Sequence, residues 1–293
     1  MKIGCLIYYF GKIYDKIGPI ALRSFKKWHP DVTLHHVNNK NGDKYYSTNL
    51  LDEFGHGVYK YMLAAEIMKK ENYDKMIILG ADTITCARLT EFIDDNDHDV
   101  LATLDYPYQL VDEGLVACPS DEHHINADVV CFNSHKPIYD IIKQSFRFKN
   151  YAEQGGLNYV AWSGLFPHTG LVVDSPYATS KVVYNVRSKG NMCLPFEYQD
   201  HSLTTGVQPM FPPYEKPWGP YLNKFYVKDN ALYTSDNKQI KVWHYCEGFG
   251  GLSEENFVKL VNNYINKWFN IETKQFFKNH CQSEDFFEKR FVL

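Results

Sequence analysis

The carboxylate of Asp82 closes an apolar run, KMIILGAD, that spans residues 75–82. A run of this kind predicts a buried strand with Asp82 at its carboxyl end. Ligands of open α/β sheets bind beyond the carboxyl ends of the strands, so Asp82 is a candidate binding residue. The alternative is that Asp82 caps a helix expected over residues 87–95, because Asp and Thr both favour helix starts.

Other groupings of reactive side chains give weaker signals. The pair His123 and His124 would suit a metal-dependent hydrolase, but it lacks H-E-x-x-H spacing and favours a polar loop. No G-x-S-x-G, P-loop or strand-linked G-x-G-x-x-G supports a serine hydrolase, a kinase or a dehydrogenase. A glycosidase needs two carboxylates, and Asp82 with Asp128 or Glu153 would provide them.

Strand and helix patterns alternate through the first half of the chain, where Asp82 lies. We expect strands over residues 2–10, 31–38, 75–82 and 99–105, and helices over residues 16–28, 58–72 and 87–95. This alternation predicts an α/β fold with a mostly parallel central sheet and helices on both faces.

The second half is less regular. We expect strands over residues 125–134, 170–174 and 181–186, and helices over residues 137–148 and 153–162. Residues 164–241 are rich in Pro, Gly, Tyr and Asn, which indicates an irregular substrate-binding lobe rather than a separate domain.

Two further helices are expected near the C-terminus, over residues 253–269 and 273–291, with Ser253 at the first helix start. Apolar residues recur in them at helical spacing, which predicts packing against the domain. Dimerisation, or peripheral attachment to a membrane, is the alternative.

Composition narrows the class of protein. The chain has 293 residues with 31 basic and 35 acidic side chains, and no basic stripe suggests a nucleic-acid partner. No apolar run approaches the ~18 residues of a membrane span, and the N-terminal run indicates a first strand rather than a signal peptide. The seven cysteines form no C-x-x-C pair, which favours a reduced, cytoplasmic protein without a cysteine zinc site.

Five segments, in order, resemble motifs of the GT-A glycosyltransferases of family 8, the glycogenin-like enzymes. KMIILGADTI resembles the strand that carries D-x-D, INADVVCFN the N-A-G-V-x-x-x-N strand, and EQGGLNYV the D-Q-D-x-L-N helix start. VVYNV and KVWHYCEGFG match the later x-x-Y-N and H-F-x-G motifs. Each is weak alone, but their order over residues 75–250 favours the family and argues against a glycosidase.

The resemblance implies a single GT-A domain over residues 1–293. It would comprise a nucleotide-binding half (1–105), a half for donor sugar and acceptor (106–250) and C-terminal helices (251–293). It also implies a divalent ion, Mn²⁺ or Mg²⁺, bound by Asp82 and His244 and bridging the diphosphate of the donor. A buried strand-end histidine is the alternative for His244.

The chain departs from the family at several site positions. Gly80 replaces the first Asp of D-x-D, so donor phosphates and water would complete the metal site. In the N-A-G-V-x-x-x-N motif Asn126 is kept, whereas Asp128 stands where glycine is usual. Asp128 is either a surface residue, a sugar ligand or a catalytic base. Glu153 and Gln154 match the sugar-binding Asp and the residue near the anomeric carbon, while Gly155 replaces a polar residue.

The resemblance places the nucleotide near the end of the first strand. Tyr9 is our candidate for stacking on the base, and Lys60 for a phosphate contact, although a solvated lysine is the alternative for Lys60. Asn126 and Gly248 complete the expected donor contacts.

These features together predict a metal-assisted hexosyltransferase or related enzyme. Its donor would be a nucleotide sugar, with UDP the expected nucleotide, and its acceptor a hydroxyl of a glycan, glycolipid or protein. Retention of anomeric configuration is expected from the family, with inversion possible if Asp128 is a base. The alternative function is a non-catalytic nucleotide-sugar-binding or carbohydrate-binding protein on a GT-A scaffold.

Overall fold

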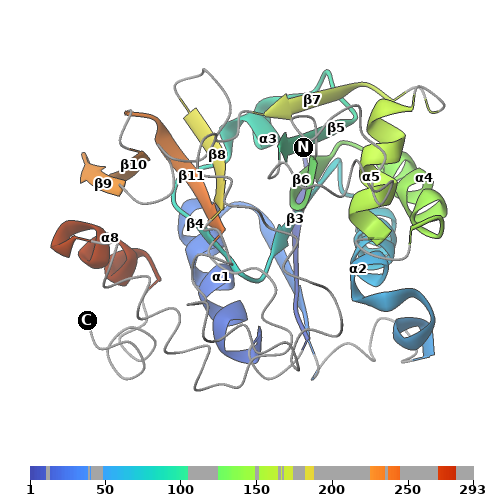
Figure 1. Cartoon of the computed structure of the whole chain (residues 1–293), viewed down its shortest axis with the longest axis horizontal. Helices are drawn as coiled ribbons and strands as arrows, with labels where there is room; N and C mark the ends of the chain where they lie inside the picture. Colours follow the sequence, from blue (N-terminus) through green and yellow to red (C-terminus); the bar gives the residue numbers. More distant parts are fainter. Residues whose placement is uncertain are drawn as a thin grey trace, which may run out of the picture. The chain divides into compact units, whose positions relative to one another are not determined.

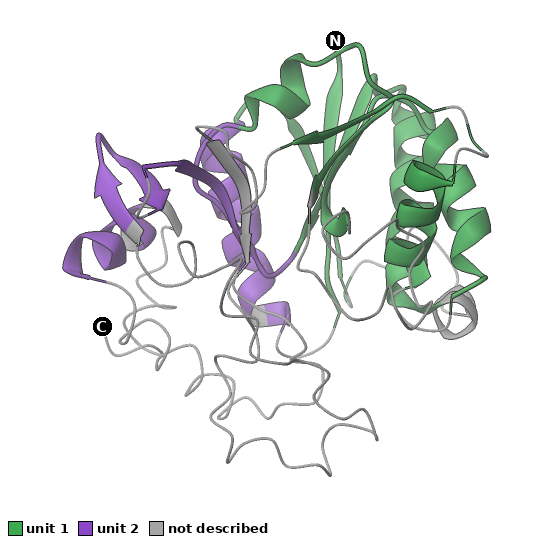
Figure 2. Cartoon of the chain, turned by 45° about the horizontal axis from the view of Figure 1, so that its top comes forward, with its two compact units in different colours: residues 1–10, 30–80, 89–173 green, residues 11–29, 81–88, 174–293 purple. Residues whose placement is uncertain are grey.

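The computed structural model describes residues 1–10, 14–38, 40, 49–104, 125–148, 152–163, 166, 168–173, 182–187, 225–234, 237–244 and 270–281. The chain forms two compact units (Figure 2). Unit 1 comprises residues 1–10, 30–80 and 89–173, and unit 2 comprises residues 11–29, 81–88 and 174–293. Each unit is described by itself.

Unit 1 is a six-stranded sheet with helices (Figure 1). Its strands are β1 Ile3–Tyr8, β2 Thr33–Val37, β3 Lys75–Gly80, β5 Val100–Leu104, β6 Ile125–Phe132 and β7 Gly170–Val173. Its helices are α2 Asn49–Glu71, α3 Thr90–Asp94, α4 Lys136–Ser145 and α5 Ala152–Trp162. The three longer helices, α2, α4 and α5, contact one another and lie together beside the sheet in Figure 2.

The sheet of unit 1 has the order β2-β1-β3-β6-β5-β7. Three pairings are parallel (β1–β2, β1–β3 and β5–β7), whereas β6 runs antiparallel to both β3 and β5. The expected α/β fold with a mostly parallel sheet is therefore confirmed. All six residues of β3 are buried, because neighbouring elements cover both faces of this central strand.

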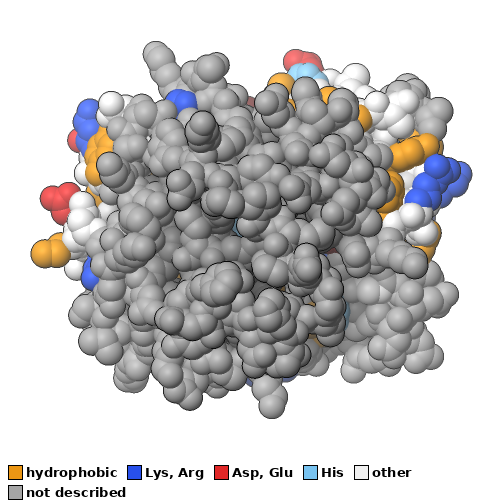
Figure 3. Space-filling model, viewed as in Figure 1, with side chains coloured by type: hydrophobic (Ala, Val, Ile, Leu, Met, Phe, Trp, Pro, Cys, Tyr) orange, Lys and Arg blue, Asp and Glu red, His pale blue; other side chains and the backbone are white. Residues whose placement is uncertain are grey.

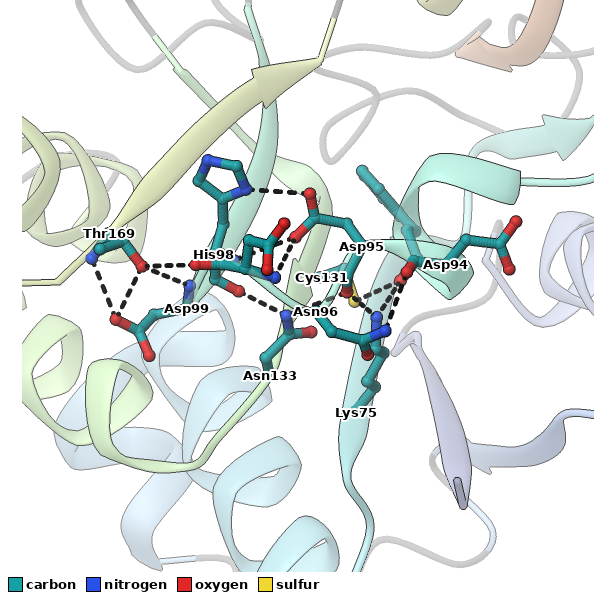
Figure 4. Close-up of polar contacts among 11 residues, drawn as sticks. Lys75, Asp94, Asp95, Asn96, His98, Asp99, Cys131, Asn133 and Thr169 are labelled. Carbon is teal, nitrogen blue, oxygen red and sulfur yellow. Dashed lines mark hydrogen bonds and ion pairs between the residues drawn. The ribbon is translucent and has the colours of Figure 1, made fainter.

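A polar network fixes the start of β3 (Figure 4). The buried ammonium of Lys75 donates hydrogen bonds to the carbonyl oxygens of Phe92 and Asp95, near the end of α3. Asn133, just after β6, also donates to the carbonyl of Asp95, and His98 bonds the Asp95 carboxylate at 2.9 Å. The network holds β3, α3 and the end of β6 together. Strand β3 is therefore fixed at its start, and its carboxyl end at Gly80 has a defined position in the sheet.

Unit 2 contains a second sheet and two described helices. The elements are α1 Tyr14–Trp28, β4 Thr83–Thr85, β8 Val182–Arg187, β9 Phe225–Lys228, β10 Ala231–Thr234, β11 Gln239–His244 and α8 Ile271–Cys281. The sheet order is β4-β11-β10-β9, and β8 pairs with β11 in parallel. Helix α8 packs through the buried Phe277, whose ring lies 4.7 Å from that of Trp243 in β11.

Some expectations for the elements need revision. Helix α3 begins at Thr90, with Leu89 as its N-cap, so the alternative in which Asp82 caps this helix is wrong. The helix expected over residues 58–72 extends back to Asn49 as α2, with a kink at Gly55, whose φ of 74° interrupts the helical backbone. The helix expected over residues 253–269, and Ser253 with it, lies outside the described residues.

Candidate active site

In unit 2, strand pairing brings Asp82 and His244 together. Strand β4 begins directly after Asp82 and runs antiparallel to β11, with Thr83 opposite His244. The Nε2 atom of His244 lies 3.1 Å from Oδ1 of Asp82. The imidazole is 1% exposed and the carboxylate 12% exposed. The two residues that the resemblance names as metal ligands are therefore adjacent.

The geometry of this pair fits a shared divalent ion. Two neighbouring ligands of an octahedral ion, each about 2.1 Å from it, lie about 3 Å apart, which matches the distance between Asp82 and His244. One carboxylate oxygen and one imidazole nitrogen form a donor set suited to Mn²⁺.

One ring nitrogen of His244 is unsatisfied within the part of the chain that the structure describes. Its Nδ1 atom is buried and has no hydrogen-bond partner among the described residues. A buried histidine that serves only the fold normally has its polar atoms satisfied. The unpartnered nitrogen is not the one that faces Asp82, so it does not distinguish a metal ligand from a buried strand-end histidine, whose expected position at the end of β11 is correct.

In unit 1, two amides of α5 complete the edge of β6. Strand β3 pairs with β6 only as far as Leu79 opposite Val129, so the first residues of β6 extend beyond it. Asn158 accepts a hydrogen bond from the Ile125 N–H (2.8 Å) and donates one to the Ile125 carbonyl (3.0 Å). One turn earlier, Oε1 of Gln154 accepts from the Ala127 N–H at 3.1 Å.

These bonds explain part of the motif around α5. Residues four apart lie on one face of a helix, so Gln154 and Asn158 act on β6 together as a strand partner would. Tyr61 of α2 adds a hydrogen bond from its hydroxyl to the Ala127 carbonyl at 3.1 Å. Sequence reasoning missed Asn158 and Tyr61, although the spacing of the two amides was a readable signal. Gln154 thus has a positioning role, and its catalytic role stays a prediction.

A lysine and two carboxylates meet beside this edge of β6. Lys60 of α2 is buried and pairs with the half-buried carboxylate of Asp128. Glu153 of α5 packs against Gly57, one turn before Lys60, so closely that an added Cβ at Gly57 would overlap the carboxylate. Three functional side chains named from the sequence are therefore neighbours, and Gly57 makes the space for one of them.

The cluster has one ammonium and two carboxyl groups, and this imbalance, with burial, affects the pKa of Glu153. The pKa of the Glu153 carboxyl is raised chiefly by burial; the Lys60 ammonium opposes this effect and Asp128 adds to it. Lys60 is thus a buried, paired lysine rather than the solvated one of the alternative interpretation. Its expected phosphate contact is untested.

The remaining predicted donor contacts are also buried. Asn126 is 1% exposed, and its Oδ1 accepts a hydrogen bond from the Asp128 N–H at 2.9 Å. Tyr9 is 5% exposed, and its hydroxyl accepts a hydrogen bond from Asn38 at 3.0 Å. Both roles in donor binding stay predictions. Gly248 lies outside the described residues, as do His123 and His124.

The surface gives little further guidance about partners. On the face drawn in Figure 3, the described residues carry side chains of both charge signs. Among the residues that the structure describes, no helix is both long and apolar enough to span a membrane.

Comparison with known proteins gives similarities in structure only. No protein-family model matches the sequence, and no curated protein matches it. A structure of the galactosyltransferase LgtC in complex with donor and acceptor sugar analogs is similar over 98% of this chain and 99% of that one, with a TM-score of 0.48 and 16% identity. Mouse xyloside xylosyltransferase 1 in its apo form is similar over 83% of this chain and 97% of that one, with a TM-score of 0.43 and 11% identity.

A third similar structure is a glycosyltransferase involved in the glycosylation of the major capsid of PBCV-1. The similarity covers 64% of this chain and 86% of that one, with a TM-score of 0.43 and 13% identity. Similarities at this level do not assign an activity, which has to be argued from the residues of this chain.

Proposed function

We propose that this chain is a GT-A glycosyltransferase of the family 8 type. It would transfer a sugar, a hexose or a related one, from a nucleoside diphosphate donor, expected to be a UDP-sugar, to a hydroxyl group. The observation that carries the proposal is the 3.1 Å approach of His244 Nε2 to Asp82 Oδ1. The family resemblance names these two residues as metal ligands, and strands β4 and β11 hold them side by side.

The proposed roles follow from the positions of the residues. Asp82 and His244 would hold a divalent ion, which when bound neutralises charge on the diphosphate leaving group. Gln154 and Asn158 hold the edge of β6 in place, and Gln154 is the candidate residue beside the anomeric carbon.

In the transfer, the bond between the anomeric carbon and the diphosphate oxygen breaks, and its electron pair leaves with the diphosphate. A bond forms from the acceptor oxygen to the anomeric carbon, and in the retaining route the hydroxyl proton passes to an oxygen of the departing diphosphate. Retention of configuration is part of the proposal, with Glu153 beside the sugar. Asp128 acting as the base that takes the proton would correspond to inversion instead.

The direct test is release of UDP from a panel of UDP-sugars in the presence of Mn²⁺, followed by chromatography. We expect slow donor hydrolysis without an acceptor, and no release by the Asp82→Ala variant. The Asp97→Asn variant, which removes an exposed carboxylate of unit 1, is the matched control and should behave as the unaltered chain. UDP-sugar binding without any release would instead support the non-catalytic binding protein.

The partners remain part of the proposal. We expect a hydroxyl acceptor on a glycan, a glycolipid or a protein, and a cytoplasmic location. The buried Phe276 and Phe277 of α8 favour packing of this helix within unit 2. Dimerisation or membrane contact through the C-terminal helices stays a prediction, which sedimentation in the presence and absence of lipid vesicles would test.

A further inference from the structure

Unit 1 has a pocket at the start of β3, at the opposite end of this strand from Gly80. The pocket lies between the start of β3, the segment after α3 and the segment that joins β6 to α4. Its volume is about 530 Å³, within the range of about 300–1,000 Å³ that is usual for ligand pockets. Lys75, Asn96 and Asn133, which are labelled in Figure 4, line it.

Two polar groups of the pocket lining have unused hydrogen-bonding capacity. The ammonium of Lys75 has three N–H groups, and it donates to the carbonyl oxygens of Phe92 and Asp95, with no third partner among the described residues. The amide nitrogen of Asn133 donates to the carbonyl oxygens of Asp95 and His98, which fixes the orientation of the amide. Its buried Oδ1 has no hydrogen-bond partner in the described part of the chain, although buried polar atoms are normally satisfied. Lys75 thus has a donor left for a ligand, and Asn133 an acceptor.

The other polar side chains of the lining add both donors and acceptors. Asn96 donates from its amide nitrogen to a nearby carbonyl at 3.0 Å, which leaves its amide oxygen as an acceptor. Ser134 and His135 also line the pocket, and each can donate and accept. His135 is the N-cap residue of α4 and makes no side-chain cap hydrogen bond. A ligand that both donates and accepts matches this lining.

The charges and the apolar surface of the pocket favour an uncharged ligand. The lining contains the ammonium of Lys75 and the carboxylate of Asp74, whose charges offset each other. A phosphate group would meet the Asp74 carboxylate and the amide oxygens, all of which are acceptors. Met68 and Tyr73 contribute apolar surface. An uncharged molecule with several hydroxyl groups and an apolar face, such as a sugar, fits these properties.

We propose that this pocket is a second carbohydrate-binding site, which holds a sugar residue of a glycan away from the transfer site. A sugar hydroxyl can accept from the Lys75 ammonium and donate to Oδ1 of Asn133. The choice of a glycan among hydroxyl-bearing ligands rests on the proposed function, in which a glycan is an expected acceptor. At about 3.3 Å per residue, the two ends of β3, Lys75 and Gly80, are about 17 Å apart. The pocket therefore takes a sugar residue that does not react, and it adds a second point of attachment for a long acceptor.

The test uses methionine methyl groups as local probes. The full chain, labelled with ¹³C at these methyl groups, is titrated with maltose, lactose, cellobiose or inorganic phosphate and followed by NMR. We expect a saturable shift of the Met68 methyl resonance with at least one disaccharide. Met62, in the same helix but not in the pocket lining, should not shift.

Variants then place the binding at the pocket. Combining Asn96→Ala with Ser134→Ala removes two hydrogen-bonding groups and should weaken disaccharide binding by at least about fivefold. Ser134→Phe fills the pocket and should abolish binding. Lys143→Ala, at an exposed position of α4 outside the pocket, is the matched control and should bind unchanged. The methyl spectra also report whether each variant is folded.

The outcomes separate the carbohydrate site from the function on which it rests. If no disaccharide shifts Met68 in a chain that releases UDP from a UDP-sugar, the site is wrong and the function stands. Saturable shifts of Met68 in a chain that releases no UDP would support the site and overturn the function. Shifts with phosphate alone, equal shifts at Met62 and Met68, or unchanged binding by the folded variants would each overturn the site.

Discussion

Replacing Asn158 by Ala removes the side chain that satisfies both backbone groups of Ile125. Asn158 is fully buried, its two bonds to Ile125 measure 2.8 and 3.0 Å, and Ile125 itself is 3% exposed. A buried backbone group left without a partner costs about 1–3 kcal/mol, so the two groups together cost about 2–6 kcal/mol. That is a large part of the 5–15 kcal/mol (roughly) that stabilises a typical folded domain.

The assay is urea denaturation followed by circular dichroism. The matched control is Asn96→Ala, which removes an exposed amide bonded to the Asp94 carbonyl at 3.0 Å, and it should change stability by less than about 0.5 kcal/mol. If Asn158→Ala is no more destabilising than the control, α5 does not hold the edge of β6 in the way described.

Three further predictions concern charge and packing. The raised pKa of Glu153 means that its contribution to stability is present below the ordinary value of 4.5 and is lost as pH rises through the higher folded-state pKa. Glu153→Gln should therefore raise the free energy of unfolding at neutral pH and make it less dependent on pH above 4.5. Urea titrations across roughly pH 4–8 measure this dependence, and the same pH profile in the variant and the unaltered chain would contradict the prediction. Phe277→Ala should lower the free energy of unfolding by about 3–5 kcal/mol. Gln275→Ala, on the exposed side of α8, should change it little. Equal shifts in the melting temperatures of the two variants would show that α8 does not pack through Phe277. Truncation after Glu272 deletes Phe276 and Phe277 and should give an insoluble chain; a soluble, active remnant that no longer self-associates or binds vesicles would indicate an attachment role instead.

Strands with a strong apolar signal could be predicted from the sequence. The runs that form β1, β3 and β6 are buried almost throughout, and they were expected as strands. The direction of β6 was not predictable, because a strand buried on both faces has the same residue pattern whether its neighbours run parallel or antiparallel.

Short elements that depend on distant partners were not predictable either. Strand β4 has three residues and exists through its pairing with β11, far away in the sequence. Without β4, a cap for the helix expected over residues 87–95 was the alternative role for Asp82. The structure instead begins α3 at Thr90, and this removes the capping role of Asp82.

The site was predictable only in part, because it also depends on pairing between strands that are far apart in the sequence. Asp82 and His244 were paired by family resemblance, and no spacing rule connects them; their 3.1 Å approach depends on the register of β4 with β11.

The central claim is that Asp82 and His244 bind a divalent ion together with the donor. With two adjacent protein ligands, the ion should bind weakly alone and much more tightly with UDP, whose phosphate oxygens complete its coordination. Isothermal titration calorimetry of Mn²⁺ with and without UDP measures this coupling, which must be equal in both directions. We predict a coupling of at least about tenfold in affinity, lost in both Asp82→Ala and His244→Ala and kept in Asp97→Asn. Equal UDP affinity in EDTA and in Mn²⁺, with both site variants indistinguishable from the unaltered chain, would contradict the claim.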